Sequence, residues 1–341
     1  MGTPPYWGGL DDIELWHQIA IWQSLKIEVH CVHTGIIHGY LLDVKKELEN
    51  IGVIYHTSRE WAHCKGMHTI SYCNGNFLTN LHVIKKYCKA SLWLNCMTWA
   101  FRKEIEAHKL GLIDFFIYQT THGKDMISKH LIPSSKHPFR ALINVPYFDP
   151  KPFTFLYNRP RDKFRFGRIS RADPVKFHKQ QFEIYEKIQS PVPKDGIVMG
   201  WNDKISAHYG FKSSPLSYVT ILKERGISQQ EFYKHCDCLI QQASTHENLP
   251  RVGMEAMASG SVLVVDNRGG WKAEVEDGIT GFLCSNAEEF IEKSTFLANN
   301  PEVREQMRFS ALNKLINTWS FEKAKESWTN IFNEVEKLYG E

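Results

Sequence analysis

The sequence lacks any long hydrophobic run. Its longest apolar stretches, such as residues 112–118, which Asp114 interrupts, have at most the length of a strand, far short of the roughly 18–20 residues that cross a bilayer. The opening letters MGTPPYWGGLDDIE contain no basic segment followed by an apolar one, so they do not have the pattern of a secretory signal. We therefore expect a cytoplasmic protein without a transmembrane segment.

An excess of charge of one sign is also missing. The 41 Lys and Arg residues against 38 Asp and Glu residues give a formal net charge of +3, which gives no argument for a polyanionic partner such as nucleic acid. None of the eight cysteines forms a C-x-x-C pair, and several lie in apolar, strand-like stretches. We expect reduced thiols and no metal site.

Two further patterns are absent. No internal repeat of fixed period occurs, and no G-x-G-x-x-G follows an opening strand. The second absence argues against a dinucleotide-dependent oxidoreductase. The sequence has 341 residues, 43% of them hydrophobic, which is the composition of an ordinary globular protein. This length is enough for two domains with separate cores.

Strand-like apolar runs alternate with segments of helical period along nearly the whole chain, which predicts parallel, doubly wound sheets. The predicted strands are 26–33, 52–58, 67–73, 91–98, 113–120, 140–148, 164–170, 196–201, 217–223, 237–244, 261–266 and 281–284. The predicted helices are 40–52, 77–88, 101–112, 123–131, 175–188, 229–236, 251–260, 271–277, 287–299, 301–318 and 321–339.

The stretch 149–163 contains three prolines without clear periodicity and is predicted to link two domains. We therefore predict an α/β protein with two Rossmann-like domains and a cleft between them. The predicted ranges are 1–152 for the first domain, 153–320 for the second and 321–341 for a terminal helix.

Ligand groups in such folds lie at the carboxyl ends of the strands. In FRFGRISRADPVKF, Gly167 permits a close turn at a predicted strand end, and Arg168 and Lys176 flank the loop that follows. Two cations beside a helix start suit a diphosphate. Taken alone, the pattern is loose, and the alternative is a set of ordinary solvated charges.

The second candidate segment runs from residue 244 to residue 283. Glu247 follows a predicted strand, and Glu255 lies eight positions later on the next helix, so the two carboxylates could accept hydrogen bonds from different hydroxyls of one sugar-bearing ligand. Gly253 removes a side chain on that helix, and Gly269 and Gly270 form a flexible loop after the next strand. The alternative is two solvated glutamates and close helix–sheet packing.

Together these segments carry a resemblance. ENLPRVGMEAMASGSVLVV followed by RGGWKAEVEDGITGFL resembles the nucleotide-sugar half of retaining GT-B glycosyltransferases of family four, the glycosyl transferases group 1. The two glutamates match that family's E-x7-E motif, and FGRISRADPVKF resembles its phosphate-binding segment. The resemblance covers residues 164–285 closely and implies the GT-B fold.

The resemblance implies a role for each matching residue. Arg168 and Lys176 would neutralise the donor diphosphate, Glu247 would hold hydroxyls of the donor sugar, and Glu255 would hold the ribose. Gly269 and Gly270 would line the sugar–phosphate pocket together with Gly167 and Gly253. Gly8 and Gly9, followed by a helix over residues 11–24, would match the family's N-terminal glycine loop, and the terminal helix would cross back to the first domain.

Three departures from the family pattern matter. The chain reaches Gly8 and Gly9 with almost no room for the family's first strand, so the N-terminal sheet is expected to lack it or the chain to be trimmed. Where many members carry a histidine after a strand, this chain offers Cys96 or Thr98, with His122 after the next strand. The pair LP replaces the family's common FG after the first glutamate.

Aromatic residues make up 13% of the chain, and most are expected to pack in the core. Tyr6 and Trp7, beside the glycine loop, and His122 are the candidates for an acceptor side.

The sequence thus predicts a hexosyl-type glycosyltransferase that moves a sugar from a nucleoside diphosphate, UDP or GDP, to an acceptor. The resemblance implies retention of configuration without a metal or other cofactor. The acceptor stays open among glycan, lipid carrier, protein and nucleobase. Two alternatives remain: a non-catalytic nucleotide-sugar-binding or scaffold protein of this fold, and a GT-B nucleotide-sugar epimerase.

Overall fold

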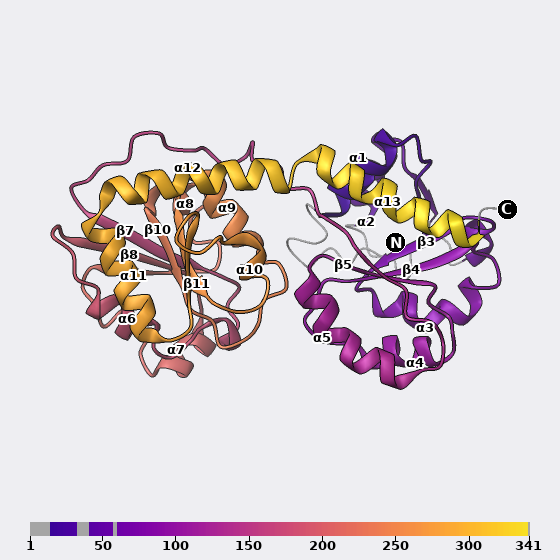
Figure 1. The fold of residues 1–341 in the computed structure, drawn as a ribbon, viewed down its shortest axis with the longest axis horizontal. Coiled ribbons are helices and arrows are strands. Elements are labelled where there is room, and N and C mark those ends of the chain that lie inside the picture. Colours follow the sequence, from indigo (N-terminus) through magenta and orange to yellow (C-terminus); the bar gives the residue numbers. More distant parts are fainter. Residues whose placement is uncertain (1–13, 33–40, 57–59, 340–341) are drawn as a thin grey trace. The chain divides into compact units, whose positions relative to one another are not determined.

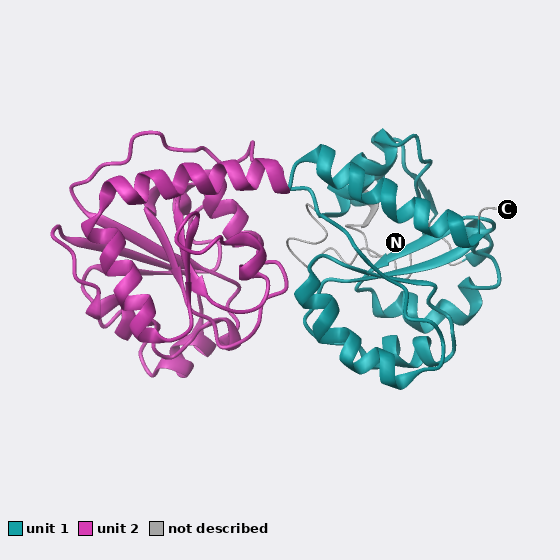
Figure 2. Cartoon of the chain, in the orientation of Figure 1, with its two compact units in different colours: residues 1–148, 319–341 teal, residues 149–318 magenta. Residues whose placement is uncertain are grey.

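The chain divides into two compact units (Figure 2). In this computed structural model, residues 14–32, 41–56 and 60–339 are described. Unit 1 comprises residues 1–148 and 319–341, and unit 2 comprises residues 149–318. The candidate residues Tyr6, Trp7, Gly8 and Gly9 lie outside the described residues.

Unit 1 contains two parallel sheets. One has four strands in the order β3-β4-β5-β6, and the other pairs β1 with β2. Their bounds are β1 His30–Val32, β2 Ile54–His56, β3 His68–Tyr72, β4 Ala90–Asn95, β5 Phe115–Tyr118 and β6 Ala141–Ile143. Every residue of β4 is buried, as expected for a strand with both faces covered.

Helices cover both faces of the four-stranded sheet (Figure 1). They are α1 Leu15–Ser24, α2 Leu41–Asn50, α3 Gly75–Ile84, α4 Arg102–Lys109, α5 Thr121–Leu131 and α13 Phe321–Tyr339, with short 3₁₀ turns at Trp61–Cys64 and Ile132–Ser134. Side chains of β4 alternate between two cores: Leu92 and Leu94 pack with α1 and α13, whereas Trp93 packs with α3, α4 and α5. This period of two matches the strand geometry.

The terminal helix α13 packs in unit 1. Trp328 is buried, lies edge-on to Trp22 with ring centroids 5.1 Å apart, and donates a hydrogen bond to the Gln18 side chain. Near the start of the helix, the Val145 amide donates to the Ser327 hydroxyl at 3.0 Å. Residues far apart in the sequence therefore share one core.

Unit 2 contains one parallel sheet of six strands in the order β12-β11-β10-β7-β8-β9. The strands are β7 Phe164–Ile169, β8 Lys194–Trp201, β9 Val219–Lys223, β10 Cys238–Gln241, β11 Val262–Asp266 and β12 Gly281–Cys284. The chain builds outward from β7 to β9, then returns to the other side of β7 and builds outward again. The topological switch point therefore lies between β7 and β10.

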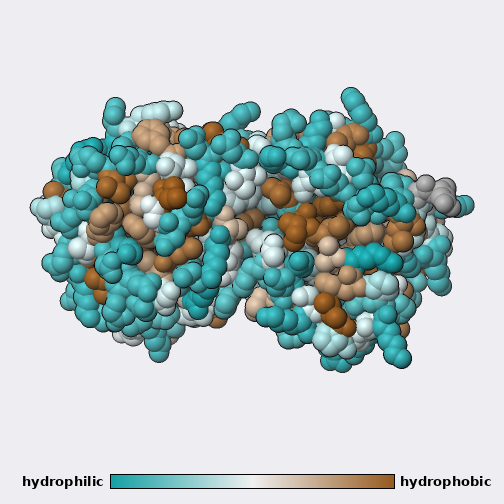
Figure 3. Space-filling model, viewed as in Figure 1, coloured by the Kyte–Doolittle hydropathy of each residue, from teal (hydrophilic) through white to brown (hydrophobic). Residues whose placement is uncertain are grey.

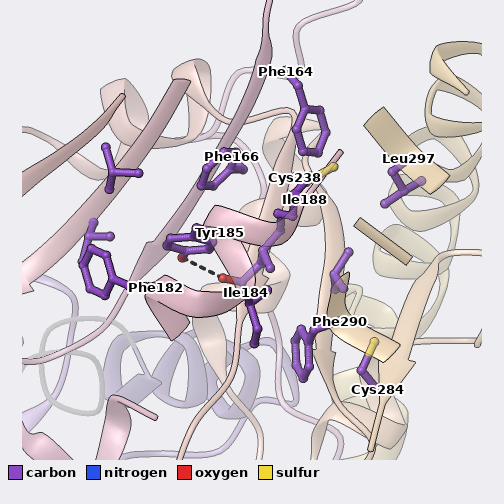
Figure 4. Packing of buried hydrophobic residues seen from close by; sticks show 14 of the residues in the cluster. Phe164, Phe166, Phe182, Ile184, Tyr185, Ile188, Cys238, Cys284, Phe290 and Leu297 are labelled. Carbon is purple, nitrogen blue, oxygen red and sulfur yellow. Dashed lines mark hydrogen bonds between the residues drawn. The ribbon is translucent and has the colours of Figure 1, made fainter. Parts of the chain in front are cut away.

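The helices of unit 2 also cover both faces of its sheet. They are α6 Gln181–Lys187, α7 Asp203–Tyr209, α8 Gln229–His235, α9 Arg251–Ser259, α10 Trp271–Glu274, α11 Ala287–Asn299 and α12 Pro301–Thr318, with a 3₁₀ turn, η4, at Pro174–Lys176. In the core against α6 and α11, the aromatic rings of Phe164, Phe166 and Tyr185 pack together, and the Tyr185 hydroxyl donates to the Ile240 carbonyl at 3.0 Å (Figure 4).

The predicted fold class, two Rossmann-like doubly wound domains, is confirmed. The predicted single helix over 175–188 is wrong: η4 ends at Lys176, and α6 begins at Gln181. The sequence interpretation also missed α7, which Asn202 caps at its start and Gly210 ends in a left-handed conformation. Among the described residues, no helix is long and apolar enough to span a membrane.

Candidate functional site

The candidate site lies where β7, β10 and β11, three adjacent parallel strands of unit 2, end. Their carboxyl ends share one edge of the sheet, so the loops after residues 169, 241 and 266 meet there. These loops carry most of the residues that the sequence selects, and the switch point between β7 and β10 is part of the same edge.

Lys176 and Glu247 form the central contact of this edge. The Lys176 ammonium donates to both carboxylate oxygens of Glu247, each at 2.5 Å. Their side chains are 18% and 15% exposed, so the pair is mostly shielded but reachable from solvent. Lys176 ends η4, whose start is capped by the Asp173 carboxylate, which accepts from the Val175 amide. The structure thus brings together two residues 71 positions apart.

Arg168 lies in β7 and is fully buried. Its guanidinium carbon stacks 3.7 Å from the centre of the Phe177 ring, and its Nη2 donates to the Lys176 carbonyl at 2.6 Å. Its Nε and Nη1 atoms have no hydrogen-bond partner within the described part of the chain. Burial lowers the pKa of Arg168. This cation therefore positions the backbone of Lys176 and keeps two unused donors.

Gly269 and Gly270 pack directly against the loop that carries Glu247. The Gly270 amide donates to the Glu247 carbonyl at 2.8 Å. A Cβ at position 269 would lie 2.5 Å from that carbonyl oxygen, and one at 270 would lie 1.6 Å from the Asn248 carbonyl oxygen. Gly269 also has a φ of +62°, a conformation that favours glycine. Side chains at these positions would push the two loops apart.

Glu255 lies on α9 and is 5% exposed. One carboxylate oxygen accepts hydrogen bonds from the Tyr233 hydroxyl at 2.9 Å and from the Gln229 amide at 3.2 Å. Burial raises the pKa of Glu255 to about 7, despite these donors. Its carboxyl group therefore changes charge near neutral pH.

Gly253 and Gly167 are closely surrounded by neighbouring side chains, which leave no room for a Cβ. A Cβ on Gly253 would lie 1.8 Å from a carboxylate oxygen of Glu274, so this glycine makes room for that side chain. The close turn expected at Gly167 is wrong: Gly167 lies within β7, where a Cβ would approach the Cys236 sulfur to 2.5 Å. His122, a candidate for the acceptor side, lies in the first turn of α5 in unit 1, just after β5.

Two acidic residues near this edge were missed by the sequence interpretation. Glu274 on α10 is fully buried, and its carboxylate oxygens have no hydrogen-bond partner among the residues described. Burial raises the pKa of Glu274 well above its usual range. Asp266 ends β11 and accepts from the Ala243 amide at 2.8 Å, and burial raises its pKa to about 6.

A signal for Glu274 was present: it follows the Gly269-Gly270 pair by four positions on the next short helix. Asp266 could have been found as the last residue of a predicted strand. No cluster of three or more His, Cys, Asp or Glu side chains in residues 14–32, 41–56 and 60–339 could hold a metal ion.

The chain resembles known proteins both in sequence and in fold. Residues 219–314 match the family of glycosyl transferases group 1. Trehalose synthase from Pyrococcus horikoshii is 27% identical over 184 residues, which cover 49% of this chain and 43% of that protein. The match therefore spans less than half the length of this relative.

Solved structures resemble the chain over nearly its whole length. HepE from Anabaena in complex with UDP has a TM-score of 0.69 at 16% identity and covers 96% of this chain and 98% of its own. A glycosyltransferase from Rickettsia africae has the same TM-score and identity, covering 98% and 97%. Sucrose-phosphate synthase from Thermosynechococcus elongatus has a TM-score of 0.62 at 13% identity and covers 88% and 78%.

The matched segment contains Glu247, Glu255 and the Gly269-Gly270 pair. The chain therefore has the GT-B fold, and its residues 219–314 are related to the glycosyl transferases group 1.

Proposed function

We propose that unit 2 binds a nucleoside diphosphate sugar, and that the protein transfers the sugar to an acceptor with retention of configuration and without a metal ion. The Lys176–Glu247 contact carries this proposal. It holds a cation and a hydrogen-bond acceptor together at the sheet's switch point, where both remain partly exposed. HepE, of similar fold, has been solved in complex with UDP-glucose, which supports a uridine nucleotide as the first donor to test.

In this proposal, Lys176 stabilises the diphosphate. Negative charge grows on the leaving phosphate as the glycosidic bond breaks, and a fixed ammonium group lowers the energy of that transition state. Arg168 contributes through the Lys176 carbonyl that it holds, and its two unused donors become available to phosphate when the loop after β7 shifts. The departing phosphate accepts the proton of the attacking hydroxyl, so no side-chain nucleophile is required.

The two glutamates bind different parts of the donor. Glu247 exchanges part of its contact with Lys176 for hydroxyls of the sugar, since a carboxylate accepts several hydrogen bonds. Glu255 accepts from ribose hydroxyls in place of Gln229 or Tyr233. Gly269 and Gly270 keep the backbone free of side chains beside Glu247. On the acceptor side, Tyr6, Trp7 and His122 remain candidates.

A donor hydrolysis assay tests this proposal without knowledge of the acceptor. UDP-glucose and GDP-glucose are incubated with the wild type, and release of free nucleotide is measured. Lys176→Met is expected to reduce release by roughly 10²–10³-fold, because a fixed charge that stabilises the transition state is removed. The matched control is Lys187→Met, since Lys187 is an exposed lysine paired with Glu183 at 2.7 Å.

Equal rates in the two variants would contradict the role of Lys176. Binding of donor nucleotide by the wild type without hydrolysis or transfer to any acceptor would support the second candidate, a nucleotide-sugar-binding protein without catalysis. The complete burial of Arg168 favours that second candidate.

A further inference from the structure

Two cysteines of unit 1 form a candidate site that the proposed donor site does not use. Cys73 follows β3 and Cys96 follows β4, so both lie at the carboxyl ends of two adjacent parallel strands (Figure 1). Their sulfur atoms are 2.9 Å apart, and both residues are free cysteines. Apolar surface is less specific, because apolar side chains gather on the visible faces of both units (Figure 3). The sulfur pair therefore points to a defined chemistry.

The backbone of Cys73 has an unusual conformation that its neighbours hold in place. Its φ is +47°, in the left-handed region that residues other than glycine rarely adopt. The Cys73 amide donates to the Leu94 carbonyl at 3.0 Å, and the Cys96 amide donates to the Cys73 sulfur at 3.1 Å. The end of β4 thus holds this sulfur directly beside Cys96. Backbone strain of this kind is concentrated at functional sites.

The loop that carries Cys96 is fixed by the buried side chain of Asn95, the last residue of β4. The amide oxygen of Asn95 accepts from the Met97 backbone at 2.9 Å. Its amide nitrogen donates to the Trp99 carbonyl at 3.1 Å and to the Glu104 carboxylate at 2.8 Å. Because Cys96 lies between anchored positions, its sulfur has little freedom to move away from Cys73.

The two sulfurs need only a small movement to form a bond. A disulfide bond is about 2.05 Å long, so sulfurs that lie 2.9 Å apart approach by roughly 0.9 Å. The thiolate is the nucleophile in such chemistry, and the hydrogen bond with Cys73 together with burial raises the pKa of Cys96 well above its usual range. Cys96 also packs against the core of α1 and α13, whereas Cys73 lies in the turn before α3. Cys73 is therefore placed to react first.

We propose that Cys73 and Cys96 are a redox site that reacts with a low-molecular-weight disulfide, such as oxidised glutathione, and closes reversibly to an intramolecular disulfide. The Cys73 thiolate attacks one sulfur of the reagent, a mixed disulfide forms, and one glutathione thiolate leaves. Cys96 loses its proton to solvent and attacks the Cys73 sulfur, and the second glutathione leaves. The protein loses two electrons and two protons, and the reagent gains them as two thiols. The closed form joins the turn before α3 to the loop after β4.

Oxidation of the folded chain, followed by peptide mapping, tests this inference. The wild type is incubated with oxidised glutathione, the remaining thiols are alkylated, and the tryptic peptides are analysed by mass spectrometry. Trypsin places Cys73 in the peptide of residues 66–85 and Cys96 in the peptide of residues 90–102. We expect these two peptides to be linked, the protein to lose two hydrogen atoms in mass, and reduced glutathione in excess to reverse the change.

Single substitutions separate the roles of the two sulfurs. Cys96→Ser removes the second thiol, so one glutathione is expected to remain attached at Cys73. Cys73→Ser is expected to take up at least tenfold less glutathione at Cys96 than Cys96→Ser takes up at Cys73. Cys88→Ser, which removes another partly exposed cysteine of unit 1, is the matched control and is expected to form the same link as the wild type.

Three results would overturn the proposal. One is glutathione attached to the wild type without a link between Cys73 and Cys96, and another is a link that involves Cys88 instead. The third comes from the same reaction in urea, where the unfolded chain is expected to distribute disulfides over several pairs of its eight cysteines. An equal preference for one pair in urea would mean that spacing along the chain selects it and the fold does not. None of these results depends on donor binding in unit 2.

Discussion

Burial of acidic side chains is the main physical feature of the candidate site at the scale of single residues. Glu255, Asp266 and Glu274 all lie near one edge of a sheet, and burial raises the pKa of each. The E-x7-E spacing predicts the presence of Glu255, but spacing cannot show that Tyr233 and Gln229 would contact it. Those partners come from α8, and only the folded chain brings them to α9.

The raised pKa of Glu255 predicts how the free energy of unfolding depends on pH. Its pKa is about 7 in the folded protein and near 4.5 when unfolded, so the folded state holds the proton more tightly. Protonated Glu255 therefore adds about 3 kcal/mol to the free energy of unfolding at and below pH 4.5. This contribution is lost as the pH rises from 4.5 through about 7. Urea unfolding at pH 5 and pH 7.5 is expected to show a smaller loss for Glu255→Gln than for the wild type.

Glu183→Gln, which changes an exposed helix residue, serves as the control and is expected to keep the wild-type dependence on pH. Identical pH dependence in Glu255→Gln and the wild type would contradict the raised pKa of Glu255. Comparing variants is necessary because Asp266 and Glu274 contribute shifts of the same sign.

At the scale of elements, long periodic segments were predictable and short capped ones were not. The last three helices have the bounds that the pattern predicts, and Trp328, Ile331 and Val335, which recur at helical spacing on the last of them, are buried. Leu338 has the same spacing but is 41% exposed, because it lies at the end of the helix. The missed helix α7 has seven residues, too few to show a clear period, although its Asn202 and Gly210 caps are recognisable signals.

The packing of α13 is tested by Trp328→Ala. The change removes a fully buried indole, its edge-on contact with Trp22 and its hydrogen bond to Gln18, and is expected to lower the free energy of unfolding by about 3–5 kcal/mol. Trp328→Phe is expected to cost less, since most of the apolar contact is kept. Denaturant unfolding followed by circular dichroism measures both, and equal, small losses would contradict the role of this helix as part of the unit 1 core.

At the scale of the whole molecule, the sequence predicts two Rossmann-like domains, but not the order of the strands. Strand order is set by pairing across the chain, and it determines that β7 and β10 are neighbours. This adjacency explains why residues from segments 71 positions apart, Lys176 and Glu247, meet.

The most direct measurement of the central claim is thermal stabilisation by UDP, GDP, ADP and dTDP, with the wild type and Lys176→Met in parallel. A nucleotide at about 100 times its Kd adds about 2.7 kcal/mol to stability, which corresponds to a rise in Tm of roughly 5–10 °C for a unit of this size. We expect one diphosphate to stabilise the wild type and to lose most of that effect in Lys176→Met. If none of the four raises Tm while a control transferase responds to its own nucleotide, the assignment of a donor site to unit 2 is wrong.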